Sequence, residues 1–303
     1  LDSGPDCAGE IFFSDLDIDE SFYSKSSPVI QIISESDVSD VLVHRNQTTH
    51  KGDHGHVLMI GGNNGMEGAI RIAAEASLRA GSGLVSVLST SQSCEIINQI
   101  RPEVMCHDAS KVGSVSSLID KADIIGIGPG LGTDEWAVNL YDHALASEKH
   151  LVLDADALNI LSSEIRDRGN WTLTPHPGEA ARLLDSSVSN IQSDRINAIT
   201  EISNKYSANV LLKGKFTLIK SPNSDFPFMI TGGNPGMATA GMGDLLTGVI
   251  SSFLGQFGTN DAAKIISVAA HIHSKAGDLG SEDGERGLIA SDLLTYIRKL
   301  VNP

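Results

Sequence analysis

An aspartate at the end of a glycine-rich stretch is the residue of this sequence best placed for chemistry. Residues 232–250 read GGNPGMATAGMGDLLTGVI, with Asp244 directly after Gly243 and an apolar helical pattern beyond it. At the start of a helix, the backbone N–H groups of Gly241, Met242 and Gly243 would hold a phosphoryl group. Asp244 would then accept the proton of a hydroxyl that attacks the phosphorus. The alternative is an aspartate that only stabilises the positive end of the helix dipole.

A second candidate is the segment TPHPGEAARLL, residues 174–184, which reads as a proline-shaped turn that opens a helix. His176 in this turn could hydrogen-bond a ligand. Glu179 could hold a metal-bound water, because Mg²⁺ usually keeps several of its waters when a protein binds it. The alternative is a rigid proline turn with Glu179 in the first turn of a helix.

Three further loops carry residues of the right type. GIGPGLG, residues 126–132, either brings its backbone close to a ligand or forms only a tight turn. Asp154 and Asp156 in LDADALN follow a predicted strand, where they could orient Mg²⁺ with its waters or cap the next helix. Lys213 and Lys215, around Gly214, supply either phosphate-binding charges or two solvated side chains of a hairpin.

The histidines of the chain are interpreted as non-catalytic apart from His176. The segment THKGDHGH, residues 49–56, is predicted to be a solvated loop, since nothing else in the chain offers a completing metal ligand. His271 and His273 are two residues apart in a helical segment and face different directions. They are therefore predicted to be structural.

Composition limits the class of protein. The chain has 303 residues, a net charge of −16 and no visible basic face, so nucleic-acid binding is not expected. A local glycine-rich helix start can still bind a small anion. Three scattered cysteines indicate neither a disulfide framework nor a metal site and favour a cytoplasmic setting. The acidic start does not resemble a signal peptide, and no apolar run is long enough to predict a membrane span.

The elements that must position these residues alternate between strand and helix from residue 56 onward. This order predicts a mostly parallel α/β sheet covered on both faces. Each candidate loop follows a strand, and ligands of such sheets bind at the carboxyl ends of the strands. Smaller expectations are a strand-like run over Glu10 to Phe13, a helix capped by Ser36 that runs through Val43, and terminal helices over 240–255, 261–279 and 289–300.

Taken together, the motifs resemble one family. KGDHGHVLMIGG, GPGLG, DADALN, TPHPGEAARLL, LLKG and NPGMATAGMGDLLTGVI occur in the order and spacing of the carbohydrate-kinase-like dehydratases. These are the ADP-dependent NAD(P)H-hydrate dehydratases, and the resemblance runs from about residue 50 to the end. It implies a ribokinase-like three-layer α/β/α fold over residues 28–303. Residues 1–27 resemble the end of the epimerase domain that precedes this dehydratase in bifunctional repair enzymes.

The resemblance also implies roles for individual residues. Asp244 matches the substrate-binding and catalytic acid, and Gly243 matches a nucleotide-binding glycine. The other substrate-binding positions are Ala69, Gly130, Gly132 and His176. The segment that lines the nucleotide is Lys213, Gly214, Lys215, Phe216 and Thr217, next to the loop of Gly241 and Met242. The family uses ADP, with ATP as the alternative, together with Mg²⁺, and its members are often tetramers.

These implications lead to a functional hypothesis. The substrates would be NADHX and NADPHX, the hydrated forms of NADH and NADPH, and the products would be NAD(P)H, AMP and phosphate. The competing hypotheses are a small-molecule kinase of the same fold, acting for example on a vitamin-precursor alcohol, and a nucleotide-binding module without catalysis. The kinase would leave a stable phosphorylated product, whereas the dehydratase releases inorganic phosphate.

Overall fold

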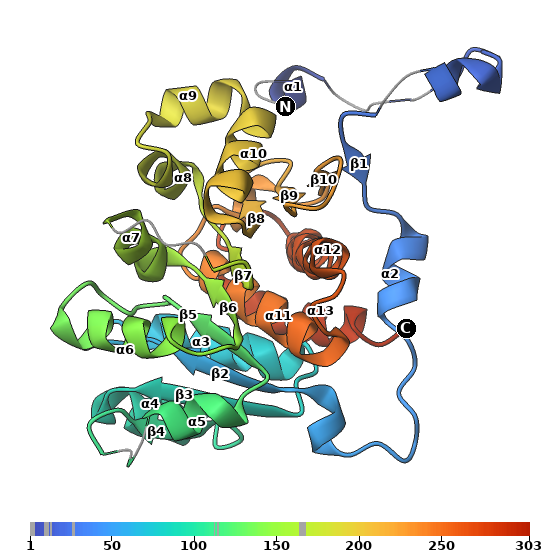
Figure 1. Cartoon of the computed structure of the whole chain (residues 1–303). Helices are drawn as coiled ribbons and strands as arrows, with labels where there is room; N and C mark the ends of the chain where they lie inside the picture. Colours follow the sequence, from blue (N-terminus) through green and yellow to red (C-terminus); the bar gives the residue numbers. More distant parts are fainter. Residues whose placement is uncertain are drawn as a thin grey trace.

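The computed structural model describes residues 4–8, 12, 14–25, 28–111, 113, 115–163 and 168–303. In these residues ten strands form one sheet in the order β1-β10-β9-β8-β7-β6-β5-β2-β3-β4 (Figure 1). Neighbouring strands from β8 to β4 are parallel, and β9 is antiparallel to both β8 and β10. The strands are β1 Gln31–Ile32, β2 His56–Ile60, β3 Leu84–Ser89, β4 Met105–Asp108, β5 Ile124–Ile127, β6 His150–Leu153, β7 Trp171–Leu173, β8 Asn209–Leu212, β9 Leu218–Lys220 and β10 Phe228–Met229.

Helices cover both faces of this sheet, which confirms the predicted three-layer α/β/α class (Figure 1). One layer contains α3 Glu67–Arg79, α4 Ser91–Ile100, α11 Met242–Phe257, α12 Ala262–Gly280 and α13 Leu293–Leu300. The other contains α5 Val115–Lys121, α6 Glu135–Leu145, α7 Ala155–Ser163, α8 Pro177–Leu183, α9 Val188–Ser193 and α10 Arg195–Tyr206. Two short helices precede them, α1 Gly4–Cys7 and α2 Glu35–Val41.

The central strands are apolar on both sides because both sides are buried. In β5, Ile125 and Ile127 belong to the hydrophobic cluster under α6 and α7, whereas Ile124 belongs to the cluster under α11 and α12. Successive side chains of a strand point to opposite faces, so each layer of helices receives every second residue. This explains the continuous apolar runs in the sequence.

Helix α11 lies very close to α3. A Cβ atom built on Gly248 of α11 would lie 2.1 Å from the backbone oxygen of Ala73 and 2.8 Å from Cβ of Ala76. The Ser77 hydroxyl donates a hydrogen bond of 3.0 Å to the oxygen of Gly248. Small residues at this crossing therefore fix the start of α11 beside the start of α3, where the candidate loops lie.

The chain reverses its direction of growth across the sheet at β2. Strands β3 and β4 lie on one side of β2, and β5, β6, β7 and β8 follow in order on the other. The loops after β2 and β5 thus face each other at the switch point of a doubly wound sheet, which is the usual ligand-binding place in this architecture.

Some expected boundaries were wrong. Ser34, rather than Ser36, caps α2, because the Ser34 hydroxyl accepts a hydrogen bond from the Asp37 amide and Asp37 in turn accepts one from the Ser34 amide. That helix ends at Val41. The last helix begins at Leu293, after a 3₁₀ turn at Ala290–Asp292. Strand β4 and helix α5 were not anticipated, and most of the strand-like run at 10–13 lies outside the described residues.

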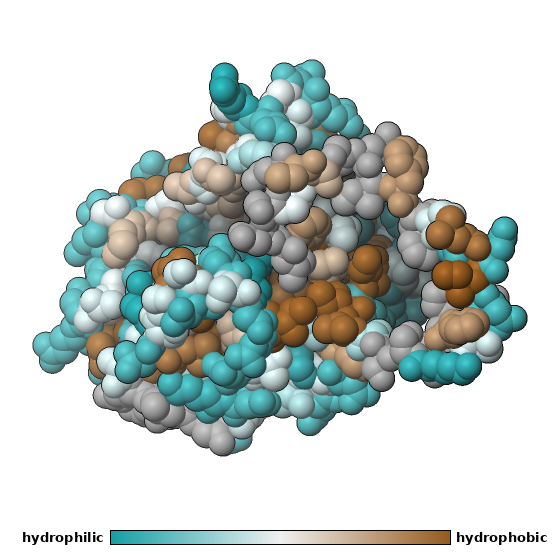
Figure 2. Space-filling model, turned by 90° about the horizontal axis from the view of Figure 1, so that it is seen from above, coloured by the Kyte–Doolittle hydropathy of each residue, from teal (hydrophilic) through white to brown (hydrophobic). Residues whose placement is uncertain are grey.

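In the described part of the chain, no helix is long and apolar enough to cross a bilayer. On the face shown in Figure 2, brown hydrophobic areas are separated by teal hydrophilic groups. Several of the exposed large apolar side chains belong to the first thirty residues, including Phe12 at 81% exposure and Leu16 at 79%.

Candidate functional site

The start of α11 forms one wall of the site. Gly241 precedes the helix with a φ of 88°, and its Cβ would lie 3.0 Å from Ile72 and 3.2 Å from Ala290. This left-handed conformation and close packing both favour glycine. The first intrahelical bond is donated by the Leu245 amide to the oxygen of Gly241, so the amides of Met242, Gly243 and Asp244 have no partner within the helix. They make this end attractive to an anion.

Asp244 lies in the first turn of α11 and is half-buried. Within the described residues, no donor is hydrogen-bonded to its carboxylate. Burial raises the pKa of Asp244 to about 6, with the Asp154 carboxylate adding to the shift and Lys213 opposing it. A carboxylate of this kind is ionised at neutral pH yet basic enough to accept a proton, as a general base requires.

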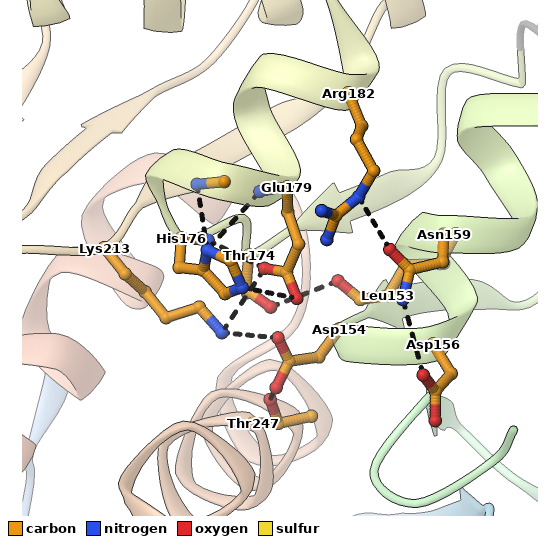
Figure 3. A network of polar contacts seen from close by, with 11 residues as sticks. Leu153, Asp154, Asp156, Asn159, Thr174, His176, Glu179, Arg182, Lys213 and Thr247 are labelled. Atoms are coloured by element: carbon orange, nitrogen blue, oxygen red, sulfur yellow. Dashed lines mark hydrogen bonds and ion pairs between the residues drawn. The ribbon is translucent and has the colours of Figure 1, made fainter. Parts of the chain in front are cut away.

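Lys213 lies at the end of β8 between two carboxylates. Its ammonium is 2.5 Å from Oδ1 of Asp154 and 4.0 Å from Oε2 of Glu179, as Figure 3 shows. Burial acts to lower the pKa of Lys213, but Asp154 and Glu179 outweigh it and the pKa is raised. A Cβ built on Gly243 would lie 3.3 Å from the Lys213 nitrogen. A permanently charged ammonium therefore lies directly beside the glycine loop of α11.

His176 and Glu179 form the opposite wall. Nδ1 of His176 accepts hydrogen bonds from the amides of Gly178 and Glu179, at 2.9 and 3.3 Å, and so caps α8. The His176 amide donates in return to Oε2 of Glu179 at 2.8 Å. Burial, followed by Lys213, lowers the pKa of His176 and so favours the neutral ring. Because Nδ1 accepts from two amides, the proton of that ring lies on Nε2, which is 3.4 Å from Oε1 of Glu179. The side chain of His176 is 51% exposed, so a ligand can reach the ring at this wall.

Glu179 itself is deeply buried, with 5% of its side chain exposed. Burial raises the pKa of its carboxyl, an effect that Lys213 opposes. The carboxylate points to the same space as Lys213 in Figure 3. The two alternatives predicted for residues 174–184, a rigid proline turn and a ligand-binding loop, are therefore compatible with the same structure.

The loop after β5 lies against the start of α3. Gly130 has a φ of 58°, and its Cβ would lie 2.6 Å from the Met66 oxygen and 3.2 Å from Cβ of Ala69. Gly132 approaches Asn63, with 3.1 Å between its ideal Cβ and the Asn63 side-chain nitrogen. The structure therefore brings the predicted substrate positions Ala69, Gly130 and Gly132 together.

The segment from Lys213 to Thr217 is the turn of the predicted hairpin between β8 and β9, in which Lys215 is exposed and Lys213 is half-buried. Buried Arg195 donates hydrogen bonds to the backbone oxygens of Leu212, Lys213 and Lys215. Thr217 donates to the oxygen of Gly214, and Phe216 has a φ of 55°. Lys215 points away from Lys213 and donates to the oxygen of Gly233 at 2.9 Å. Of the two lysines, Lys213 alone joins the cluster in Figure 3.

Asp154 is the counter-ion of Lys213 in the structure. Both of its oxygens are engaged, Oδ1 with Lys213 and Oδ2 with the Thr247 hydroxyl at 2.7 Å. An ammonium at this distance would repel a cation approaching the same carboxylate. Direct coordination of Mg²⁺ by Asp154 is therefore disfavoured, and no cluster of three or more metal-binding side chains occurs in the part of the chain described. That Asp154 and Asp156 orient Mg²⁺ through its waters stays a prediction.

Two other histidines occupy different places. His50 caps a 3₁₀ turn at Lys51–His54, before β2 and hence at the opposite end of the sheet. His273 is buried in α12, where it interacts with the Met242 backbone at the start of α11 and is within range of the Lys213 charge. Burial lowers its pKa to about 4 and keeps the ring neutral, and Lys213 adds to this shift.

A cavity of about 520 Å³ also opens at that opposite end. Its lining includes Arg45, Arg79 and Arg298, but α3, α11 and α13 all end there. The carbonyl ends of helices attract cations, so these arginines offset the helix dipoles and do not mark an anion site. Phe257 at the cavity is 13 residues beyond Asp244 in α11, which corresponds to about 20 Å at 1.5 Å per residue.

A profile of the NAD(P)H-hydrate dehydratase family matches residues 57–299. The chain belongs to this family. The dehydratase relatives include the bifunctional NAD(P)H-hydrate repair enzyme Nnr of Coxiella burnetii, 42% identical over 303 residues, which cover 100% of this chain and 62% of the relative. Nnr of Escherichia coli is 41% identical over 300 residues, 98% of this chain and 57% of its own length. The chain thus spans less than two thirds of these relatives.

Solved structures confirm the fold of this dehydratase family. A ribokinase-like superfamily protein of Enterococcus faecalis is 30% identical with a TM-score of 0.81, covering 90% of this chain and 97% of its own. The ADP/ATP-dependent NAD(P)H-hydrate dehydratase of Bacillus subtilis, co-crystallized with ATP/Mg²⁺, is 26% identical with a TM-score of 0.79, covering 89% and 97%. The ribokinase-like fold expected from the motifs is confirmed.

The sequence analysis did not single out three residues that shape the candidate site. Thr247 follows Asp244 by three positions, so helical spacing alone could have placed both on one side of α11. Arg195, on α10, supports the turn after β8 and had no local signal. Asn63 donates to the oxygen of Leu131 and to Asp134, and so ties the loop after β2 to the loop after β5.

Proposed function

We propose that this chain converts NADHX and NADPHX to NADH and NADPH with ADP as phosphoryl donor, giving AMP and phosphate. The observation that carries the proposal is the unpaired Asp244, with its raised pKa, beside the α11 amides and the Lys213 ammonium. A base for a hydroxyl and a cradle for a phosphoryl group occur within one turn of chain. Membership of the NAD(P)H-hydrate dehydratase family supports the choice of hydroxyl.

The reaction would begin at the C6 hydroxyl of the hydrated ring. Asp244 takes the hydroxyl proton while the oxygen attacks the terminal phosphorus of ADP, and the bond between that phosphorus and the bridging oxygen breaks to release AMP. The amides of Met242 and Gly243, with Lys213, stabilise the charge on the transferring phosphoryl oxygens. The ring nitrogen lone pair then expels phosphate, and loss of a ring proton restores the dihydronicotinamide.

The substrate side of the site would hold the ring against this base. The half-exposed His176 ring would offer its Nε2–H, which lies 3.4 Å from Oε1 of Glu179, and the loop of Gly130 and Gly132 packs on the α3 start at Ala69. Backbone groups and one neutral imidazole suit the uncharged carboxamide and tetrahydropyridine ring of the hydrated cofactor, because they offer hydrogen bonds without a competing charge. We expect these residues to contribute to the rate mainly by orienting the hydroxyl in line with the phosphorus.

Magnesium fits the donor set through water. Glu179 has a buried carboxylate that faces the same space as Lys213, and Mg²⁺ bound to phosphates usually needs only one or two protein carboxylates. When bound, the ion would neutralise phosphate charge. Glu179 would hold one of its waters.

The test is direct. NADHX is incubated with the protein, Mg²⁺ and ADP, then with ATP in place of ADP, and NADH absorbance and free phosphate are followed. Equal amounts of NADH, phosphate and AMP are expected. A phosphorylated product that persists would instead identify a kinase, and no consumption of ADP in the presence of NADHX would identify a binding module.

We further propose that residues 1–27 are the end of an upstream epimerase domain, that residues 28–303 form the dehydratase domain, and that the enzyme is a cytoplasmic tetramer. The shares of 62% and 57% of relatives named bifunctional support the upstream domain. Phe12 and Leu16, both strongly exposed, would be covered by it. Light scattering of the chain tests the tetramer, and limited proteolysis with and without a longer N-terminal sequence tests the boundary.

A further inference from the structure

Two carboxylates follow β6 and engage different halves of the site. Asp154 is the first residue after the strand and is 1% exposed, and Asp156 stands two residues later. Between them Ala155 has a φ of 47°, in the left-handed region that a residue with a side chain rarely adopts. Strain of this kind tends to persist where a functional arrangement requires it.

Asp154 faces the nucleotide side. Oδ1 accepts from Lys213 at 2.5 Å and Oδ2 accepts from Thr247 of α11 at 2.7 Å. Its oxygen Oδ2 would lie 3.8 Å from a Cβ on Gly243. A buried lysine has many rotamers, so a fixed counter-ion is needed to keep its ammonium at one place beside the glycine loop.

Asp156 faces the substrate side. Its Oδ2 accepts a hydrogen bond of 2.8 Å from the amide of Gly132, and Oδ1 lies 3.4 Å from the Asn159 side-chain nitrogen. In Figure 3 Asp154 points to Lys213 and Thr247, whereas Asp156 lies beside Asn159, away from the lysine. Asn63 and Gly62 hold the same loop from the β2 side, through the oxygens of Leu131, Gly130 and Pro129. Asp156 holds the Gly132 amide from the β6 side.

The backbone between the two carboxylates is itself held to β5. The Asp154 amide donates to the oxygen of Ile127 at 3.0 Å, and a Cβ on Gly128 would lie 1.8 Å from the Asp154 oxygen. The end of β6 therefore cannot shift relative to the GIGPGLG loop without a clash. Any ligand-facing group held by Asp154 or Asp156 is positioned against the same rigid strand end.

We propose that Asp154 and Asp156 are positioning residues with separate duties, the first holding the Lys213 ammonium for the nucleotide and the second holding the Gly132 loop for the hydrated ring. This inference rests on the proposed dehydratase function. Neither residue touches the reacting atoms. Together they fix the distance between the phosphoryl donor and the hydroxyl that receives it.

The experiment compares Asp154→Ala with Asp156→Ala in the full chain. Binding of ADP with Mg²⁺ and binding of NADPH, each alone, are measured by titration calorimetry, and KM values for ADP and NADHX follow. Loss of a charge-assisted hydrogen bond predicts weakening on the order of tenfold to a hundredfold. Asp154→Ala should weaken ADP and leave NADPH within about twofold, and Asp156→Ala should do the reverse.

Controls keep the two proposals apart. Asp154→Asn keeps the volume if the alanine variant does not fold, and exposed Asp283→Ala should change neither affinity. Thr247→Val should weaken ADP by less than Asp154→Ala, because it loosens the carboxylate without removing it. Equal weakening of both ligands by each variant, or no weakening, overturns the division of duties. Absence of NADH formation by the unaltered chain would instead overturn the dehydratase function.

Discussion

Replacing Asp244 by asparagine should abolish most activity and at the same time stabilise the protein. Burial raises the pKa of this carboxyl from an ordinary 3.8 to about 6. One pH unit corresponds to 1.36 kcal/mol, so the ionised side chain destabilises the folded state by about 3 kcal/mol above pH 6. Asparagine has nearly the same shape without the charge. Because Asp244 is partly exposed, solvent screens some of its charge, so we expect Asp244→Asn to raise the free energy of unfolding by about 2 kcal/mol rather than by the full ~3 kcal/mol.

The pH dependence of this stabilisation has a definite sign. Since the folded pKa lies above the unfolded one, the folded state binds the proton more tightly, and the destabilisation is full above pH 6. It diminishes as the pH falls below 6 and disappears below 3.8, where Asp244 is protonated in both states. The advantage of the Asp244→Asn variant should therefore be largest at pH 8 and small at pH 4.

Urea unfolding at pH 8, 6 and 4 measures the stability, and NADHX turnover with ADP measures the function. Turnover should fall on the order of a hundredfold to ten-thousandfold, the usual contribution of a general base. Exposed Asp283→Asn is the matched control and should change neither quantity. If Asp244→Asn is less stable than the unaltered protein at pH 8, the burial argument is wrong. If its turnover is near normal, Asp244 is not the base.

Three further predictions concern the same machinery. In the unaltered protein kcat/KM should fall about tenfold per pH unit below pH 6, because the raised pKa of Asp244 means that the base becomes protonated there. A pH–rate series in which kcat/KM starts to fall only near pH 4 would contradict this. His176→Ala should raise the KM for NADHX and lower stability by about 1 kcal/mol through loss of the α8 cap, whereas His176→Asn should recover the stability alone, as urea unfolding and kinetics would show. Gly248→Ala should destabilise by about 1–3 kcal/mol, because its Cβ would lie 2.1 Å from the Ala73 oxygen, while Gly68→Ala, with no atom within 4 Å, should not; equal unfolding midpoints would refute the close helix packing.

Much of the fold could be predicted because its signals are local. Alternating strand and helix patterns from residue 56 onward predict a parallel sheet, and buried strands such as His56–Ile60 are visible as apolar runs. Strand β4 and helix α5 were missed because their local signals are weak. Strand β4 reads MCHD, with polar residues at the margin of the sheet, and α5 has only seven residues.

The candidate site was only partly predictable. The loops could be expected to meet, because parallel strands end at one edge, and the acid in GMGD stood out beside its glycines. The local sequence could not decide whether Asp154 binds a ligand or caps a helix, nor whether Lys213 binds phosphate or is solvated. Their ion pair joins residues 59 positions apart, and nothing in either local segment shows that the two side chains face each other.

The sequence by itself determined the α/β class and the family, and it predicted the acid, since periodicity, order of motifs and a carboxylate at a glycine-rich helix start can all be read along the chain. The tertiary structure alone showed how the charged groups near Asp244 are paired. It made Asp154 the partner of Lys213, whereas no donor among the described residues is hydrogen-bonded to Asp244. The physical reason is that burial and charge pairing arise only when distant strand ends converge, and burial raises the pKa of Asp244 toward the range that the proposed base requires.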